Sequence, residues 1–555
     1  MDQLRSDFFR ILTERAIICK RYYDPETGRF MNYEVYNAKG IRRQPDGMLG
    51  WGVVQQDVII AFAYLYRTQG ENNPFYQDRE TLSMIVKAVA AWQEIMYEDY
   101  RMEFLKCNGD MFGPIYMPWS WYAWLETYIL LHDDLSADVC ATWEKILFAG
   151  FESYAKQDPT YIHNIPVWQA MCLHRAGQFF DKPDWIEAGD SLIANACTAQ
   201  QDDGYWHEGK GPSVGYNMVY MHALGMYYAH GGAVDVLPAI KRGTAFIQAC
   251  TYPNGAYVDT VDGRRRYHGI ELGWLSPLSN ACGFPALLAT KGGIAHIKAH
   301  LSHFSKANAT LAHLAAILIA LDSGKFDSVD PFNGLENTLL QDCTVVYGSM
   351  TFLRKKNCQL TLSAYTGPRV ESDFHLDRQA FASVWTEDAD LLMGGINSRN
   401  QPELSSFVIT DATGNILCDM PTDGTVTGNG SVSFDYAGFG RCSIAGTVAD
   451  DGTISLRYTA ALADPTHRWH ISLPLRPNFE PTQTRYQVYS NQGKTTVCFR
   501  GWEVSFADDY RMMSPVCPHN PYTHDLHCEM DDCILAVQLF PGQDSITVTF
   551  TRENV

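Results

Sequence analysis

A histidine and a tyrosine lie nine positions apart in a loop that is rich in glycine. The loop reads QQDDGYWHEGKGPSVGYN from Gln200 to Asn217 and contains His207 and Tyr216. An imidazole and a phenol can both transfer protons, so the pair could act as general acid and base. A helical pattern follows directly after the loop. Functional residues often lie on loops that are positioned by rigid helices or strands. We therefore predict that this loop is the reaction site.

Two more polar residues extend the candidate site along the chain. Asn164 lies in YIHNIPVWQ, 43 positions before His207, and Arg264 lies in VDGRRRYHG, 48 positions after Tyr216. An amide can donate a hydrogen bond to a carboxylate, and a guanidinium group can neutralise one. Side chains of these two types can therefore bind an acid group, and their place beside His207 and Tyr216 is what the resemblance named below implies.

Each of these residues also has a structural alternative. His207 could bond to a loop carbonyl, and Tyr216 could pack on neighbouring aromatic rings. Asn164 could form a turn, and His163 beside it competes for the same role. The run Arg264–Arg266 follows an Asp-Gly turn and could be a solvated hairpin tip.

The first part of the chain has the apolar period of helices. From Met1 to about Lys325, apolar residues recur at i, i+3, i+4 and i+7, and Gly, Pro, Asp and Asn interrupt the pattern. Many helices of about 15 residues joined by alternating short and long loops suit a toroid of helical hairpins. A repeat solenoid is the competing arrangement, but no repeat of fixed period is visible.

The second part of the chain alternates with a period of two. From about Asp342, segments such as CQLTLSAYTG and WHISLPLRP alternate and end at Gly, Asn and Asp turns. This pattern predicts a large antiparallel β-sandwich. We therefore predict a multidomain α and β protein, with an N-terminal (α/α) toroid over residues 1–330 and a C-terminal antiparallel β-sandwich over residues 331–555.

Composition excludes some classes of function. The net charge of −20 and the lack of a long basic cluster argue against nucleic acid as a partner. The longest apolar run, Leu311 to Leu321, is too short for a membrane span. The 15 cysteines lack a disulfide-framework spacing, and the N-terminal sequence shows no signal-peptide pattern, so we expect a cytoplasmic location. Aromatic residues make up 13%, which suits either a sugar-binding cleft or an ordinary core.

With Asn164, His207, Tyr216 and Arg264 in this order inside a helical half, and a β half behind it, the chain resembles polysaccharide lyases of the chondroitin AC/hyaluronate/xanthan lyase type. The resemblance implies β-elimination on an acidic oligo- or polysaccharide that contains uronic acid, with no metal and no organic cofactor. The family has a second arginine four residues after the first. This chain has His268 there, which puts substrate details in question.

The resemblance also implies a role for each residue. Asn164 and an arginine would neutralise the carboxylate next to the proton at C5, which makes the enolate-like state accessible. His207 or an ionised Tyr216 would take the proton, and Tyr216 would protonate the leaving oxygen. Arg264 would favour the phenolate by lowering the pKa of Tyr216. The predicted substrate-binding residues are Trp119, Trp121, Trp206, Arg266, His268 and Glu271.

Two other classes of function stay open at this stage. A glycoside hydrolase on the same toroid would need paired carboxylates across the cleft, and a non-catalytic sugar-binding protein would need none. Carboxylates near the candidate site are available at Asp202, Asp203, Glu208, Asp259, Asp262 and Glu271.

A second group of residues could bind a metal. The segment CPHNPYTHDLHCEMDDC in the β half brings together three cysteines and three histidines, which can indicate zinc. Their spacing fits no standard zinc finger, so whether this segment binds a metal stays open. These residues are Cys517, His519, His524, His527, Cys528 and Cys533.

Overall fold

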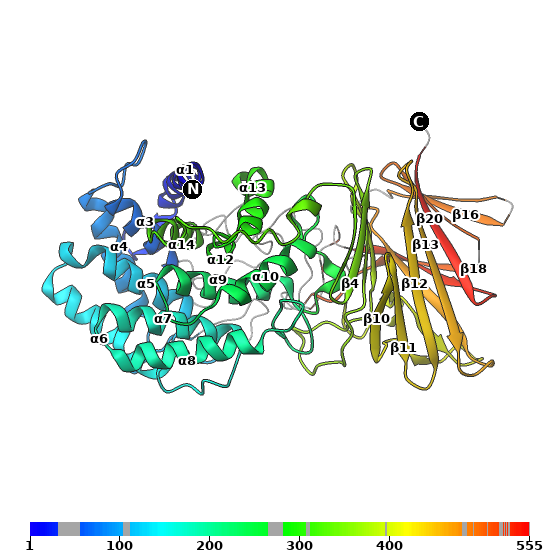
Figure 1. Ribbon diagram of the computed structural model, residues 1–555, viewed down its shortest axis with the longest axis horizontal. Helices are drawn as coiled ribbons and strands as arrows, with labels where there is room; N and C mark the ends of the chain where they lie inside the picture. Colours follow the sequence, from blue (N-terminus) through cyan, green and yellow to red (C-terminus); the bar gives the residue numbers. More distant parts are fainter. Residues whose placement is uncertain are drawn as a thin grey trace. The chain divides into compact units, whose positions relative to one another are not determined.

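The computed structural model of the chain consists of two compact units (Figure 1). The first comprises Met1–Gln200, Tyr216–Thr244 and Leu272–Gly334, and the second comprises Gln201–Gly215, Ala245–Glu271 and Leu335–Val555. The second unit thus contains the β half of the sequence from Leu335 onward and two stretches from the helical half. The structure describes residues 1–30, 56–103, 112–264, 281–306, 311–394, 397–479, 485–491, 493–507, 509–520, 526, 528, 530 and 533–553.

The first unit is built of helices, as the apolar period predicts. Polar caps fix where several of them start. The Asp78 carboxylate accepts hydrogen bonds from two backbone N–H groups at the start of α4, and Ser136 Oγ accepts one at the start of α6. The helices of the described residues are α1 (Asp2–Lys20), α3 (Ile59–Arg67), α4 (Arg79–Gln93), α5 (Pro118–Leu131), α6 (Ala137–Tyr154), α7 (Asn164–Phe179), α8 (Pro183–Ala199), α9 (Val214–Ala229), α10 (Leu237–Ala249), α12 (Phe284–Leu287), α13 (Lys291–Lys306) and α14 (Leu311–Asp322).

The first and last of these helices meet. Arg5 Nε of α1 lies 2.6 Å from Asp322 Oδ1 at the end of α14, and the Tyr64 hydroxyl of α3 donates to Asp322 Oδ2 at 2.6 Å. The bond between Arg5 and Asp322 joins residues 317 positions apart, so the layer of helices closes on itself. Closure is the property that separates a toroid from an open solenoid, and the predicted toroid is confirmed.

The second unit is built of strands that alternate between a buried and a solvated face. In β12, for example, every second residue from Cys442 to Val448 is buried. The strands, including a short hairpin in the first unit, are β1 (Tyr23–Asp24), β2 (Arg29–Phe30), β3 (Cys343–Tyr347), β4 (Met350–Lys355), β5 (Cys358–Ser363), β6 (Ala382–Thr386), β7 (Asp390–Met393), β8 (Val408–Thr410), β9 (Ile416–Cys418), β10 (Asp423–Gly428), β11 (Ser431–Tyr436), β12 (Gly440–Val448), β13 (Ile454–Leu462), β14 (Arg468–Leu475), β15 (Gln487–Asn491), β16 (Lys494–Phe499), β17 (Trp502–Phe506), β18 (Asp509–Val516), β19 (Ile534–Phe540) and β20 (Ser545–Arg552).

The strands from β3 to β20 form two antiparallel sheets that pack face to face. One sheet has the order β10-β11-β12-β13-β20-β17-β16-β15, and the other has the order β18-β19-β14-β7-β6-β5-β4-β3 with β8 and β9 attached to β14. A single apolar cluster contains Leu360 of the second sheet and Ile444 of the first. The rings of Phe381 and Phe434 lie 4.2 Å apart in it. The predicted β-sandwich is therefore confirmed.

The outer face of the ten-stranded sheet is buried as well. Thr361 and Ser383 point away from the sandwich core, yet both are fully buried. The Tyr252 hydroxyl lies 2.6 Å from Ser383 Oγ, and the Cys250 thiol contacts Met350. Chain from the helical half of the sequence thus packs on this face, which explains why residues 245–264 belong to the second unit.

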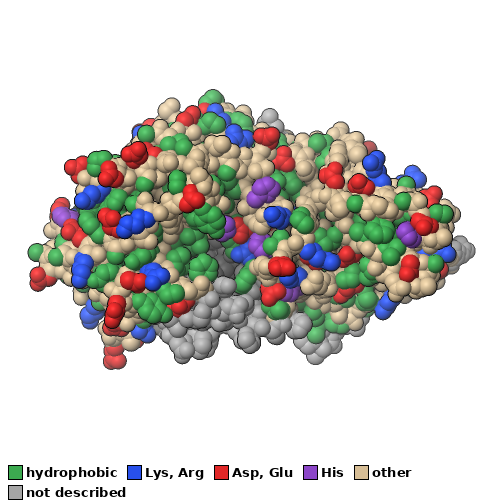
Figure 2. All heavy atoms as spheres, turned by 90° about the horizontal axis from the view of Figure 1, so that it is seen from below, with side chains coloured by type: hydrophobic (Ala, Val, Ile, Leu, Met, Phe, Trp, Pro, Cys, Tyr) green, Lys and Arg blue, Asp and Glu red, His purple; other side chains and the backbone are tan. Residues whose placement is uncertain are grey.

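No helix within the described ranges is long and apolar enough to cross a membrane. On the face shown in Figure 2, acidic and basic side chains are interspersed, and neither sign forms a continuous field there.

Candidate active site

The loop that carries His207 is fixed to the β sheet by one aspartate. Asp203 accepts hydrogen bonds from the Tyr365 hydroxyl at 2.8 Å and from Ser349 N at 3.2 Å, and its carbonyl accepts one from Tyr347. Each of these partners comes from the β half of the sequence. The sheet therefore acts as a rigid base for residues 201–215.

His207 itself lies on the surface of this loop and is exposed. Partial desolvation lowers its pKa below the usual value of 6.5, and the positive charges of Arg378 and Lys210 lower the pKa further. The imidazole is therefore neutral at neutral pH, which is the form that can accept a proton.

Arg264 has three contacts in the same unit. Its Nε donates to Glu208 Oε1 at 3.0 Å, its Nη1 donates to the Phe374 carbonyl at 3.0 Å, and its guanidinium carbon lies 5.1 Å from the centre of the Phe374 ring. Glu208 is 3% exposed, so this ion pair is largely shielded from water. The guanidinium group is held in one orientation, next to the residue that follows His207.

A second imidazole, His375, packs against the same loop. Gly209 has φ +70, and a Cβ there would overlap the His375 ring, so only glycine allows this approach. Desolvation and the charge of Arg264 lower the pKa of His375 to about 4. His375 is therefore neutral near Arg264.

One buried carboxylate joins the backbone of Arg264 to the start of α9. Asp262 is 0% exposed, and its Oδ2 accepts from Val214 N at 2.8 Å and from Ser213 Oγ at 3.1 Å. Its Oδ1 accepts from Arg264 N at 2.8 Å. Val214 is the first residue of α9, so Asp262 caps the start of that helix.

A buried arginine from the β half contacts both the loop that carries His207 and the loop that carries Arg264. Arg378 is 5% exposed and donates to the Val261 carbonyl at 2.7 Å and to the Pro212 carbonyl at 2.5 Å. A Cβ at Gly211 or Gly263 would overlap its guanidinium group. Arg378 thus connects the His207 loop to the Arg264 loop.

We expect Arg378→Met to lower the free energy of unfolding by about 2–3 kcal/mol, because two buried carbonyls lose charged donors. Urea denaturation followed by circular dichroism measures this change. The matched control is Arg441→Met on the exposed face of β12, which should stay within about 0.5 kcal/mol of the native protein. Equal effects of the two substitutions would contradict the connecting role of Arg378.

Asn164 and Tyr216 both belong to the first unit, on helices that run side by side. The ring of Trp168 in α7 stacks on His222 in α9 at 4.8 Å, and the ring of His174 contacts that of Tyr227 at 4.7 Å. The contacts occur in the same order along both helices, so α7 and α9 are parallel.

This register has a consequence for the two polar residues. Asn164 is the first residue of α7, and Tyr216 is the third residue of α9. Both therefore lie at the N-terminal ends of neighbouring parallel helices. Asn164 is 2% exposed, whereas Tyr216 is partly exposed. The structure thus places Asn164 and Tyr216 in one unit and His207 and Arg264 in the other. The convergence of all four stays a prediction.

Of the three tryptophans predicted to bind substrate, only one has a side chain that a ligand could reach. Trp121 is fully buried, and its indole N–H donates to the Leu147 carbonyl at 3.3 Å. Trp206 is 2% exposed. The prediction that these two rings stack on sugars is therefore not supported. Trp119 is partly exposed and packs on Trp168 at 5.6 Å. The predicted residues Arg266, His268 and Glu271 lie outside the described residues.

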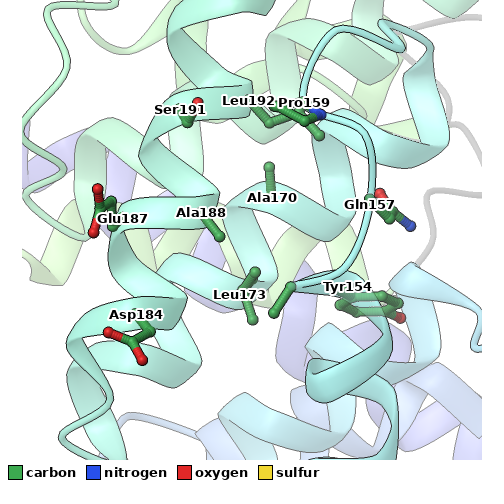
Figure 3. A pocket seen from close by; sticks show the side chains of 11 residues that line it. Tyr154, Gln157, Pro159, Ala170, Leu173, Asp184, Glu187, Ala188, Ser191 and Leu192 are labelled. Atoms are coloured by element: carbon green, nitrogen blue, oxygen red, sulfur yellow. The ribbon is translucent and has the colours of Figure 1, made fainter.

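A separate pocket of about 330 Å³ lies between α6, α7 and α8 (Figure 3). Tyr154 and Gln157 line one side, and Asp184 and Glu187 of α8 supply two acidic groups. These carboxylates would repel a polyanion, so this pocket is not a binding site for an acidic glycan.

A group of two histidines and one cysteine in the first unit has metal-like spacing. The ligand atoms of His222, Cys282 and His313 lie within 4.8 Å of one another. His222 Nδ1 accepts a hydrogen bond from Gly283 N at 3.2 Å, and the Cys282 thiol donates to the Met218 carbonyl at 3.5 Å. His222 and Cys282 are thus both hydrogen-bonded to backbone groups of the helical unit.

Several residues near the site come from positions that sequence reasoning did not select. Arg378, His375 and Phe374 are more than 100 positions from the loops that they contact. No spacing rule links them to His207. The sequence marks Asp262 as part of an Asp-Gly turn and as a candidate acid, but not as the group that bonds to the start of α9.

The described fold defines a class of proteins, namely those that combine an (α/α) toroid with an antiparallel β-sandwich. Family models and curated proteins give no match to this sequence.

Solved structures of that class do match. Chondroitin AC lyase of Streptomyces coelicolor A3, in complex with chondroitin sulphate, has a TM-score of 0.55 and 11% identity, over 99% of this chain and 80% of that one. A heparan sulfate lyase HepC mutant from Pedobacter heparinus has a TM-score of 0.52 and 11% identity, over 98% and 84%. The chondroitin lyase ODV-E66, a baculovirus envelope protein, has a TM-score of 0.50 and 10% identity, over 100% and 84%. The predicted resemblance is confirmed at the level of the fold.

Proposed function

We propose that this protein is a lyase that cleaves a uronic-acid-containing oligo- or polysaccharide by β-elimination. The observation that supports this proposal most is that a neutral His207 and a fixed Arg264, which bonds to the next residue Glu208, belong to the same unit. Elimination needs a base for a weakly acidic carbon-bound proton and positive charge or hydrogen bonds for the carboxylate beside it. Both requirements are met by these two residues.

The other two residues complete the reaction. Asn164 donates its amide to the uronate carboxylate, and Tyr216 protonates the glycosidic oxygen as it leaves. Both residues lie at N-terminal helix ends, where the helix dipole favours a negatively charged group. His207 takes the C5 proton, the electron pair forms the C4–C5 double bond, and the bond to the leaving oxygen breaks.

Product analysis tests the reaction class. We expect incubation with chondroitin, hyaluronan, heparan and alginate chains to give, on at least one of them, new reducing ends together with an equal amount of ultraviolet-absorbing unsaturated sugar. The summed mass of the products should equal that of the substrate, because elimination adds no water. Reducing ends that contain ¹⁸O from labelled water, without absorbance, would instead show a glycoside hydrolase, and inactivity on all four would leave the binding-protein alternative.

The geometry of Glu208 bears on that hydrolase alternative. A hydrolase would use this carboxylate as an acid or nucleophile. Here the carboxylate is bound to Arg264 and is nearly inaccessible to solvent. The contact favours a positioning role, in which Glu208→Gln weakens turnover but does not change the product.

The charge of Lys210 predicts a shift in the pH profile. Lys210 lowers the pKa of His207, so Lys210→Gln should raise that pKa and move the acidic limb of kcat/KM to higher pH. Because Lys210 is exposed, the expected shift is about a few tenths of a pH unit, and it should shrink at high salt. The same substitution at exposed Lys494 is the control. A shift to lower pH would contradict His207 as the base.

A further inference from the structure

Two cysteines face each other at the end of a strand pair in the second unit. Strands β18 and β19 are antiparallel neighbours, and their last pair joins Val516 to Ile534. Cys517 follows the first of these residues, and Cys533 precedes the second. The topology itself therefore brings the two thiols together where the ladder ends.

A third cysteine joins this pair. Cys517 Sγ lies 2.8 Å from Cys533 Sγ, and Cys528 Sγ lies 3.8 Å from Cys533 Sγ. All three sulfurs lie within 4.8 Å of one another. They are buried or partly buried and belong to the sandwich core or pack against it. A disulfide bond would use two sulfurs and leave the third with no role.

Three sulfurs this close together can share one metal ion. In a tetrahedral zinc site with Zn–S bonds of about 2.3 Å, neighbouring sulfurs are about 3.8 Å apart. The Cys528–Cys533 distance has this value, whereas Cys517 and Cys533, at 2.8 Å, would move apart by about 1 Å on binding. Thiolates are soft ligands that select zinc among the common divalent ions. His519, the one described histidine of this segment, has its Nε2 2.9 Å from the Asp373 carbonyl instead. His524 and His527 lie outside the described residues.

We propose that Cys517, Cys528 and Cys533 form a structural zinc site that closes the connection between β18 and β19. Binding would deprotonate the three thiols and release their protons to solvent, with no change of oxidation state.

The site is connected to the candidate active site within the same unit. Two residues after Cys517, His519 N donates to Ser398 Oγ at 3.1 Å, and the His519 ring contacts Asp373. Asp373 precedes Phe374, whose carbonyl accepts from Arg264. A metal at the cysteines would therefore stiffen the segment that orients Arg264.

Metal analysis of the full chain, purified under reducing conditions without chelator, tests the proposal. We expect about one zinc per chain, and cobalt substitution should give thiolate-to-cobalt charge-transfer bands. Cys528→Ser and Cys533→Ser should lose the metal. Cys418→Ser should retain it, since that partly buried thiol of the same unit contacts only the nearby Met420 carbonyl among the bonds described.

A second measurement avoids dependence on variants that fail to fold. Differential alkylation of the native chain, read by peptide mass spectrometry, should show Cys517, Cys528 and Cys533 protected until a chelator removes the metal. Alkylation of all three without a chelator, in a metal-free protein, would overturn the proposal. So would protection of Cys517 and Cys533 that only a reductant removes, because that result identifies a disulfide bond.

Discussion

Tyr216→Phe is expected to reduce kcat by about 10²–10⁴-fold, the usual contribution of general acid–base catalysis. The substitution removes one oxygen and keeps the ring, so the packing of the first turn of α9 should be preserved. KM should change little, because a proton donor acts in the transition state and not in substrate binding. Steady-state kinetics on a uronate polymer, followed by the absorbance of the unsaturated product, measures both constants.

The matched control is Tyr220→Phe, one helical turn further along α9. Tyr220 is 1% exposed and is buried in the helical unit, so the same atom is lost away from solvent. Its turnover should stay within about threefold of the native value, although its stability can fall by about 1 kcal/mol. If Tyr216→Phe is as active as Tyr220→Phe, Tyr216 is a packing residue and is not the proton donor to the leaving oxygen.

The fold could be read from the sequence because two different periods divide the chain. The apolar spacing of 3.6 stops near the last described helix, and alternation begins near Cys343, where the first strand of the sandwich starts. Helix α5 gave no such signal. Trp121, Trp124 and Tyr128 are all fully buried, and a helix that is apolar on every side has no amphipathic period.

The division into units could not be read from the sequence. The stretches Gln201–Gly215 and Ala245–Glu271 stand within the helical half of the sequence, so their position in the chain assigns them to that half. Their hydrogen bonds place them in the second unit instead, because Asp203 bonds to Tyr365 and Tyr252 bonds to Ser383, both from the β half. Those contacts form between positions more than 130 residues apart, and no local rule of sequence can predict them.

For the candidate site, residue types were predictable and supporting contacts were not. His207 and Arg264 stood out by their chemistry and by the resemblance. The low pKa of His207 depends in part on Arg378, which is a remote residue of the β half. Trp121 and Trp206 were predicted to bind sugar and are buried instead. An aromatic residue near a loop suits a core as well as a sugar-binding face, so sequence alone does not separate the two roles.

Arg264→Met is expected to reduce kcat/KM by about 10²–10³-fold, since a developing enolate would lose its neutralising charge. It should also lower stability by about 3 kcal/mol, because Glu208 is nearly buried and would keep a charge without its partner. The double variant Arg264→Met/Glu208→Gln separates the two effects. Removing the carboxylate charge should restore most of the stability and none of the activity.

Arg264→Lys provides a second comparison. It keeps the positive charge but loses the planar fork that bonds to both Glu208 and the Phe374 carbonyl. Its activity should therefore fall between those of the native protein and Arg264→Met, with KM rising more than kcat falls. Steady-state kinetics and urea denaturation of Arg264→Met, Arg264→Lys and the double variant show whether Arg264 acts in catalysis or only in stability. If activity recovers together with stability in the double variant, Arg264 only supports the fold, and another cation must neutralise the substrate.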